Sequence, residues 1–212
     1  MTGAPDPRGL AELEKRVDRA LTSGEESDIE VLGYGEISCV LAWHDGSELV
    51  AAKRLPLFDT SARLEAYRET FDAYLEALGA AGVQVVPSRL ESTPAADGRI
   101  AAWCLQPLLD PTSLATEWLK TANKDVSRRL ISRIADRILA AVSPRLGLDG
   151  QLSNWAVAGD EVLYFDVTTP MTRDETGRDA LDFDLFIASL PWALHGLVRR
   201  YVLGMILDTY YR

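Results

Sequence analysis

The chain has 212 residues, a formal net charge of −10, 47% apolar residues and 25% charged residues. This composition is typical of a globular protein, and the length allows one large domain or two small lobes. A negative field repels nucleic acid and anionic membranes, and no apolar run reaches the roughly 18–20 residues of a membrane helix. The basic stretch KDVSRRLISR has helical spacing and is expected to be a solvated helix face. We therefore expect no nucleic-acid partner and no membrane association.

The cysteines, the histidines and the N-terminal residues indicate where the protein is located and whether it binds zinc. The first ten residues are polar and lack a basic segment followed by an apolar core, so we predict a cytoplasmic protein without a secretory signal. Cys39 and Cys104 lie far apart in apolar stretches, which favours buried free thiols over a disulfide or a metal site. With only His44 and His195 available, a histidine-based zinc site is not expected.

The first half of the chain predicts strands with two helices among them. Apolar side chains at helical spacing, Leu10, Leu13, Val17 and Leu21, predict an amphipathic first helix. Alternating apolar residues and an HDGS turn predict a hairpin after it. The predicted elements are a helix at 8–23, strands near 29–33, 37–43 and 48–55, a helix from Thr60 or Ser61 to about Leu78, and strands at 83–90 and 99–108.

The second half of the chain predicts mainly helices. A short helix is expected at 114–121 and a long one at 125–142, followed by two short strands, WAV and VLYFDV, and an apolar helical tail at 182–212. The long helix should bury one face, made of Leu130, Ile134, Ile138, Leu139 and Val142. We predict an α+β protein with an N-terminal extension at 1–26, a β-rich lobe at 27–109 and a helical lobe at 110–212.

Two motifs in the first half could carry chemistry. Glycines in the segment Gly33–Ser38 let backbone N–H groups approach a phosphate, although Gly-x-Gly in a hairpin can also be structural. No helix is predicted directly after it, which argues against a dinucleotide-binding turn. Lys53 ends an apolar strand, where it either extends to solvent or presents a point charge, and Glu65 or Glu69 on the next helix could pair with it.

A third motif lies in LGLDGQLSNWAVAGDEVLYFDVTTP. Asn154 and Asp166, at facing positions of a small hairpin, could converge on a hard divalent cation such as Mg²⁺, which prefers oxygen ligands. Asp149 could accept a proton from a hydroxyl nucleophile. The alternative is that Asp149 and Asn154 are turn residues and that Asp166 caps a strand end.

In chain order, these motifs resemble the protein-kinase-like fold. A Gly-rich hairpin, a strand lysine, a helix glutamate, a hinge, a long helix, a D-x-x-x-x-N loop and a strand-end aspartate follow one another over roughly residues 27–195. The sequence looks closer to aminoglycoside phosphotransferase-like and other small-molecule kinases than to protein kinases. The resemblance implies a bilobal fold with an antiparallel sheet in the N-lobe and an abbreviated helical C-lobe. It also implies ATP or GTP and Mg²⁺ as cofactors.

The same resemblance implies a role for each motif residue. The implied roles are phosphate covering by Gly33, Tyr34, Gly35 and Ser38; α- and β-phosphate binding by Lys53, held by Glu69 or, as second choice, Glu65; an adenine-contacting hinge at Gln106 and Leu108; catalytic base for Asp149; and Mg²⁺ ligation by Asn154 and Asp166.

The sequence also departs from the family pattern. Gly147 stands where the family usually has a histidine, and Gln151 stands where a basic residue or histidine is usual. Val167 and Thr168, rather than Phe-Gly, follow the second aspartate, and only 46 residues follow Asp166. Because the acceptor-binding lobe is short, the acceptor binds unusually, a partner completes the site, or transfer has been lost.

Three functions remain open from the sequence. The first is an ATP-dependent phosphotransferase acting on a hydroxyl of a small molecule or peptide. The second is a kinase-like binding or scaffold protein without transfer activity. The third is a kinase-fold protein recruited to a biosynthetic pathway. The apolar tail, which includes Trp192, Tyr201 and Met205, is expected either to pack under the helical lobe or to form a homodimer or partner interface.

Overall fold

The computed structural model describes residues 6–23, 29–34, 39–184 and 209–211. It is α+β, as predicted, and divides into two compact units. The first unit comprises the described residues up to Arg68 together with Pro87–Leu108. The second comprises Glu69–Val86, Leu109–Asp182 and the described C-terminal residues. The predicted apolar tail lies outside the described residues except at its two ends.

The first unit is built on a five-stranded antiparallel sheet in the order β1-β2-β3-β5-β4. Gly46, with φ of 61°, makes the tight turn between β2 and β3 that the HDGS segment predicts. The bounds are α1 Pro7–Ser23, β1 Glu30–Tyr34, β2 Cys39–Asp45, β3 Glu48–Arg54, β4 Arg89–Pro94 and β5 Ile100–Pro107.

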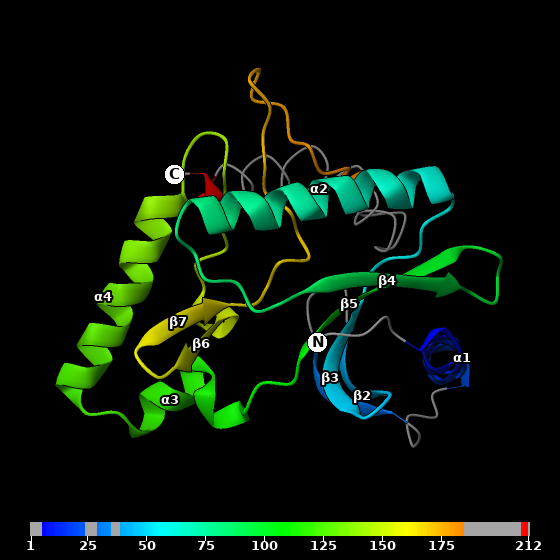
Figure 1. The fold of residues 1–212 in the computed structure, drawn as a ribbon, viewed down its shortest axis with the longest axis horizontal. Helices are drawn as coiled ribbons and strands as arrows, with labels where there is room; N and C mark the ends of the chain where they lie inside the picture. Colours follow the sequence, from blue (N-terminus) through cyan, green and yellow to red (C-terminus); the bar gives the residue numbers. More distant parts are fainter. Residues whose placement is uncertain (1–5, 24–28, 35–38, 185–208, 212) are drawn as a thin grey trace. The chain divides into compact units, whose positions relative to one another are not determined.

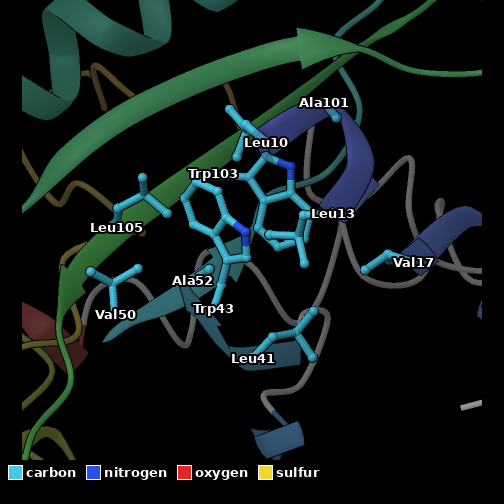
Figure 2. Close-up of a cluster of buried hydrophobic side chains, with 10 residues drawn as sticks. All are labelled: Leu10, Leu13, Val17, Leu41, Trp43, Val50, Ala52, Ala101, Trp103 and Leu105. Atoms are coloured by element: carbon cyan, nitrogen blue, oxygen red, sulfur yellow. The ribbon is translucent and has the colours of Figure 1, made fainter. Parts of the chain in front are cut away.

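Helix α1 covers one face of this sheet (Figures 1 and 2). Leu10, Leu13 and Val17 are buried, so the predicted amphipathic face is confirmed for the first three of its four residues. Leu21 is 69% exposed, and its predicted burial is wrong because the last turn of the helix extends past the apolar cluster. The strands contribute Leu41, Trp43, Val50, Ala52, Ala101, Trp103 and Leu105 to that cluster.

One ion pair is buried where α1 meets the sheet. Glu14, 2% exposed, accepts hydrogen bonds at both carboxylate oxygens from the guanidinium of Arg54 on β3. The bidentate geometry satisfies both charges, which is the condition under which burial of a pair is tolerated. The two cysteines are free thiols, Cys104 buried and Cys39 half-buried, as predicted.

Helix α2, Ser61–Ala80, begins in the first unit and continues into the second. Thr60 caps it, because its Oγ1 accepts a hydrogen bond from the N–H of Arg63 at 3.2 Å. Its buried positions follow helical spacing and are Leu64, Tyr67, Phe71, Tyr74 and Leu78.

The predicted strand at 83–90 is wrong for most of its length, since β4 begins only at Arg89. Val83 and Val86 are nevertheless buried. The backbone of this segment pairs with Tyr164 in the second unit: the N–H of Tyr164 donates to Gln84 at 2.8 Å, and the N–H of Val86 donates to Tyr164 at 2.9 Å. Its apolar residues are therefore buried in a short segment that pairs with Tyr164 and is not part of the five-stranded sheet.

The rest of the second unit consists of helices around a two-stranded antiparallel hairpin. Strand β6 contacts α3, and β7 contacts α4 (Figure 1). The side chain of Arg133 on α4 donates to the carbonyl of Asp160 in the hairpin turn. The bounds are α3 Ala115–Thr121, α4 Lys124–Ala141, β6 Trp155–Ala158 and β7 Glu161–Tyr164, with single 3-10 turns at Pro111–Ser113 and Leu152–Asn154.

Helix α4 buries a narrower face than predicted. Leu130 and Ile134 are buried, whereas Leu139 is 78% exposed, so its predicted place on the buried face is wrong. Leu139 follows Ile138 directly, and a 100° step carries it off the stripe that contacts the hairpin. Asn123 caps the helix through hydrogen bonds from the N–H groups of Asp125 and Val126.

Candidate functional site

The first unit presents Lys53 on the sheet face opposite α1. Side chains alternate along a strand, and Ala52 and Arg54 lie on the face covered by α1, where Arg54 pairs with Glu14. Lys53, between them, lies on the other face and is half-buried. The point charge predicted from the sequence is therefore on the sheet face opposite α1, next to its buried register partner Cys104.

Register places two more predicted nucleotide residues on the same face. Gly33 is directly opposite Val40, which is directly opposite Lys53. Gln106 is opposite Ala51, two residues from Lys53 on β3. Directly opposed residues of antiparallel strands share a face, and so do residues two apart in one strand. Gly33, Lys53 and Gln106 consequently lie on one side of the sheet.

Gly33 has no structural requirement to be glycine among the described residues. It lies outside the positive-φ region, and a Cβ built there meets no atom within 4 Å. Close approach of a ligand is one reason to keep a glycine in such a place. Of the other predicted loop residues, Tyr34 is described in its backbone only, and Gly35 and Ser38 lie outside the described residues.

The predicted hinge lies at the end of β5. Gln106 is in the strand and its side-chain amide donates to Ser88 Oγ at 2.8 Å, while Leu108 follows the strand end. The Gln106 side chain is thereby tied to the start of the β4 segment, which leaves the backbone of the hinge for any contact with an adenine.

The glutamate predicted to hold Lys53 is on α2. Glu69 is exposed and belongs to the second unit, whereas Lys53 belongs to the first, and their pairing stays a prediction. The second choice, Glu65, lies 3.7 Å from the guanidinium of Arg68, one helical turn away.

In the second unit, Asp149 is held by Gln151. The N–H of Gln151 donates to Asp149 Oδ1, and its side-chain amide donates to Oδ2, both at 3.1 Å. A short polar side chain that accepts from the backbone two residues on is a common turn motif. The sequence suggested only a missing charge at Gln151, and the structure shows it orienting the candidate base, which is half-buried.

Asn154 connects this loop to the hairpin. Its side-chain amide donates to the backbone carbonyl of Asp149 at 3.3 Å, and its backbone carbonyl accepts a hydrogen bond from the N–H of Phe165 at 3.1 Å. Asn154 therefore faces Phe165 rather than Asp166, and β7 ends at Tyr164, so Asp166 lies two residues past the strand end. The predicted facing of Asn154 and Asp166 is corrected by one residue.

The side-chain oxygens of Asn154 and Asp166 are candidate ligands for a hard cation that takes few of its ligands from the protein. Asp166 is half-buried, and the hydroxyl of Thr168 donates to its Oδ1 at 3.4 Å. Within the described residues there is no group of three or more His, Cys, Asp or Glu side chains able to hold a metal. One amide and one carboxylate remain, which is a donor set that Mg²⁺ accepts when phosphates and water supply the other ligands.

Gly147 is enclosed by the rest of the second unit. A Cβ added there would lie 3.0 Å from Met171 Cβ and 3.1 Å from the carbonyl oxygen of Tyr210. The N–H of Leu148 donates to the same carbonyl at 3.3 Å. Any side chain at this position would have to displace Met171 or the C-terminal residues Tyr210 and Tyr211.

Two buried tyrosines in the second unit were missed from the sequence. Tyr74 on α2 donates a hydrogen bond to the carbonyl of Gly147 at 3.2 Å, and Tyr164 is hydrogen-bonded to Tyr74. The only signal in the sequence was the helical spacing of Tyr74 with Phe71 and Leu78, which is equally typical of core packing.

A family model described as "Family of unknown function (DUF6206)" matches residues 12–212. The chain belongs to that family. No curated protein matches it.

Among solved structures, the chain is similar to "WaaP in complex with acyl carrier protein", with 14% identity, a TM-score of 0.44, and coverage of 86% of this chain and 89% of that one. It is also similar to the PknI kinase domain of Mycobacterium tuberculosis, with 16% identity, a TM-score of 0.40, and coverage of 66% and 57%. Among the described residues, the structure contains no helix with the length and apolar character needed to span a bilayer.

Proposed function

We propose that this protein is an ATP- or GTP- and Mg²⁺-dependent phosphotransferase that acts on a hydroxyl of a small molecule or peptide. The observation that carries the proposal is the position of Asn154. Its side chain is bonded to the backbone of Asp149, and its backbone is bonded to Phe165, the neighbour of Asp166. Asn154, itself one candidate metal ligand, thus connects the candidate base to the residue next to the other ligand.

Asp149 would act as the general base for a hydroxyl. Gln151 fixes the orientation of its carboxylate, and the Asp149 side chain is partly exposed. A positioned base typically accelerates such a step by about 10²–10⁴-fold. In the proposed reaction, Asp149 takes the proton of the attacking hydroxyl while that oxygen bonds to the terminal phosphorus and the nucleoside diphosphate leaves.

Asn154 and Asp166 would hold the cation through the amide and carboxylate oxygens. Bound there, Mg²⁺ would neutralise charge on the phosphates. Nucleotide binding is assigned to the sheet face opposite α1 in the first unit, where Lys53 would supply a positive charge, Gly33 would allow close backbone approach and the hinge at Gln106 and Leu108 would meet the base.

Ligand-dependent stability tests the binding part of the proposal. Unfolding temperature would be measured with and without millimolar ATP and Mg²⁺, since a ligand at about 100 times its Kd adds about 2.7 kcal/mol. That corresponds to a rise of about 5–11 °C. Asp166→Ala should lose the Mg²⁺-dependent part of the shift. Asp160→Asn, an exposed carboxylate of the same unit, should keep it.

A wild-type protein that shows no shift with any nucleotide and Mg²⁺ would contradict the proposal. Equal shifts in wild type and Asp166→Ala would contradict the assignment of the metal ligand.

The second candidate is a kinase-like scaffold that binds nucleotide without transferring phosphate. The observation in its favour is that Gln151 donates to both oxygens of Asp149 and so occupies a lone pair on each, which an acceptor hydroxyl would otherwise use. A nucleotide-dependent thermal shift together with ATP turnover no higher in wild type than in Asp149→Asn would select this candidate.

A further inference from the structure

Tyr74 and Tyr164 are two buried phenols to which the proposed reaction gives no role. Their exposed fractions are 0% and 1%. Tyr164 is hydrogen-bonded to Tyr74, and Tyr74 donates onward to the carbonyl oxygen of Gly147 at 3.2 Å. A buried hydroxyl without a partner costs free energy, and here both hydroxyls are satisfied by one continuous chain of bonds.

The two ends of this chain lead to the two carboxylates of the candidate site. Gly147 lies two residues before Asp149, and Tyr164 lies two residues before Asp166. The hydrogen bonds therefore connect the backbone that leads to the candidate base with the backbone that leads to the candidate metal ligand.

Tyr164 is itself held firmly in the second unit. Its N–H and C=O pair with Gln84 and Val86, and its ring lies 5.2 Å from that of Trp155, the residue after Asn154. Movement of Tyr164 would consequently disturb Asn154 and Asp166 together.

We propose that Tyr74 and Tyr164 are positioning residues that set the geometry of Asp149 and Asp166 for phosphoryl transfer. This inference rests on the proposed function. Tyr74 supports the backbone at Gly147, where an added Cβ would lie 3.0 Å from Met171 Cβ and 3.1 Å from the carbonyl oxygen of Tyr210. The hydrogen bond to the carbonyl of Gly147 is donated by Tyr74 on α2 and not by a residue of the Asp149 loop.

Tyr74→Phe tests the inference, because it removes the hydroxyl and keeps the ring. With ATP and Mg²⁺ as the probe, kcat for ATP consumption should fall about 10–100-fold, as is usual when a supporting hydrogen bond is lost, while KM for ATP stays within about twofold. Tyr164→Phe should have the same effect, and the double variant should be no worse than the more affected single variant, since the two hydroxyls belong to one chain of bonds.

Phe71→Leu is the matched control. Phe71 is buried on the same helix but has no hydroxyl. It should lower the unfolding temperature and leave kcat at the wild-type value when both are measured well below unfolding. If Tyr74→Phe does not fold, Tyr164→Phe breaks the same chain from its other end and decides the question.

The outcomes separate the two proposals. Wild-type turnover far above that of Asp149→Asn, with wild-type kcat in the tyrosine variants, would overturn the positioning role alone. A fall in kcat in Phe71→Leu equal to that in Tyr74→Phe would also overturn it, since loss of stability would then explain both. Turnover in wild type no higher than in Asp149→Asn would overturn the phosphotransferase proposal, and the positioning role with it.

Discussion

The α1-covered sheet face of the first unit and the Asp149 loop of the second unit are held in place by different forces. Ten apolar residues and the fully satisfied ion pair of Glu14 and Arg54 fix the sheet face. Hydrogen bonds through Gln151, Asn154 and Tyr74 fix the loop. The sheet face buries its charges, whereas the loop leaves Asp149 half-buried. Stability and proposed chemistry are therefore expected to respond to different substitutions.

The largest effect on stability is expected at the buried ion pair. Arg54→Met leaves Glu14 buried without its cation and should lower the free energy of unfolding by about 3–5 kcal/mol. The double variant Glu14→Leu/Arg54→Met should recover most of that loss, because two apolar side chains need no partner. Urea denaturation measures both. A loss below about 1 kcal/mol for Arg54→Met would show that the pair is solvated and would weaken the contrast with the loop.

Gly147 tests how tightly the loop is enclosed. Gly147→Ala places a Cβ 3.0 Å from Met171 Cβ and 3.1 Å from the carbonyl of Tyr210, and overpacking of this kind costs about 1–3 kcal/mol. The control is Gly79→Ala on α2, where a Cβ meets no atom within 4 Å and helix propensity should add up to about 1 kcal/mol. Urea denaturation in which both variants are stabilised to the same degree would contradict the packing of the C-terminal residues at Gly147.

The buried phenols predict how stability depends on alkaline pH. The pKa of Tyr74 is raised in the folded protein, chiefly by burial, above its unfolded value of about 10. The unfolded state therefore loses this proton first, and stability falls as pH rises above about 10, by up to about 1.4 kcal/mol per pH unit for each such group. Tyr74→Phe should have a shallower decline than wild type. Free energies of unfolding at several alkaline pH values measure the slopes, and identical slopes would contradict the burial of the hydroxyl.

The smallest effect is expected at exposed apolar residues. Leu139→Lys on α4 should change the free energy of unfolding by no more than about 0.5 kcal/mol, because the side chain is 78% exposed. Leu130→Ala on the same helix removes a buried side chain and should cost about 2–5 kcal/mol. If Leu139→Lys is as costly as Leu130→Ala in urea denaturation, Leu139 is covered in solution by a partner or by a second copy of the chain.

Much of the fold follows from local patterns. The first helix, the β2–β3 hairpin and the N-caps at Thr60 and Asn123 depend on spacing, glycine and short polar side chains, which are visible in the sequence. The strand predicted at 83–90 was wrong because its apolar residues satisfy their backbone through Tyr164, about 80 residues away. Such a long-range partner has no local signature.

The candidate site was predictable in its residue types and not in its supports. The spacing of Asp149, Asn154 and Asp166 suggested a base and two metal ligands. The spacing did not show that Asn154 is bonded to the Asp149 carbonyl, that Gln151 orients the carboxylate, or that Tyr74 on α2 donates to the carbonyl of Gly147. These contacts depend on tertiary packing, and they decide whether the motif can act.

The most direct test of the central claim is ATP consumption by wild type and Asp149→Asn in the presence of Mg²⁺ and a panel of hydroxyl acceptors, with Asp160→Asn as the control. A phosphotransferase should lose about 10²-fold or more of its turnover in Asp149→Asn and none in Asp160→Asn. Equal turnover in wild type and Asp149→Asn, with every acceptor, would contradict the claim.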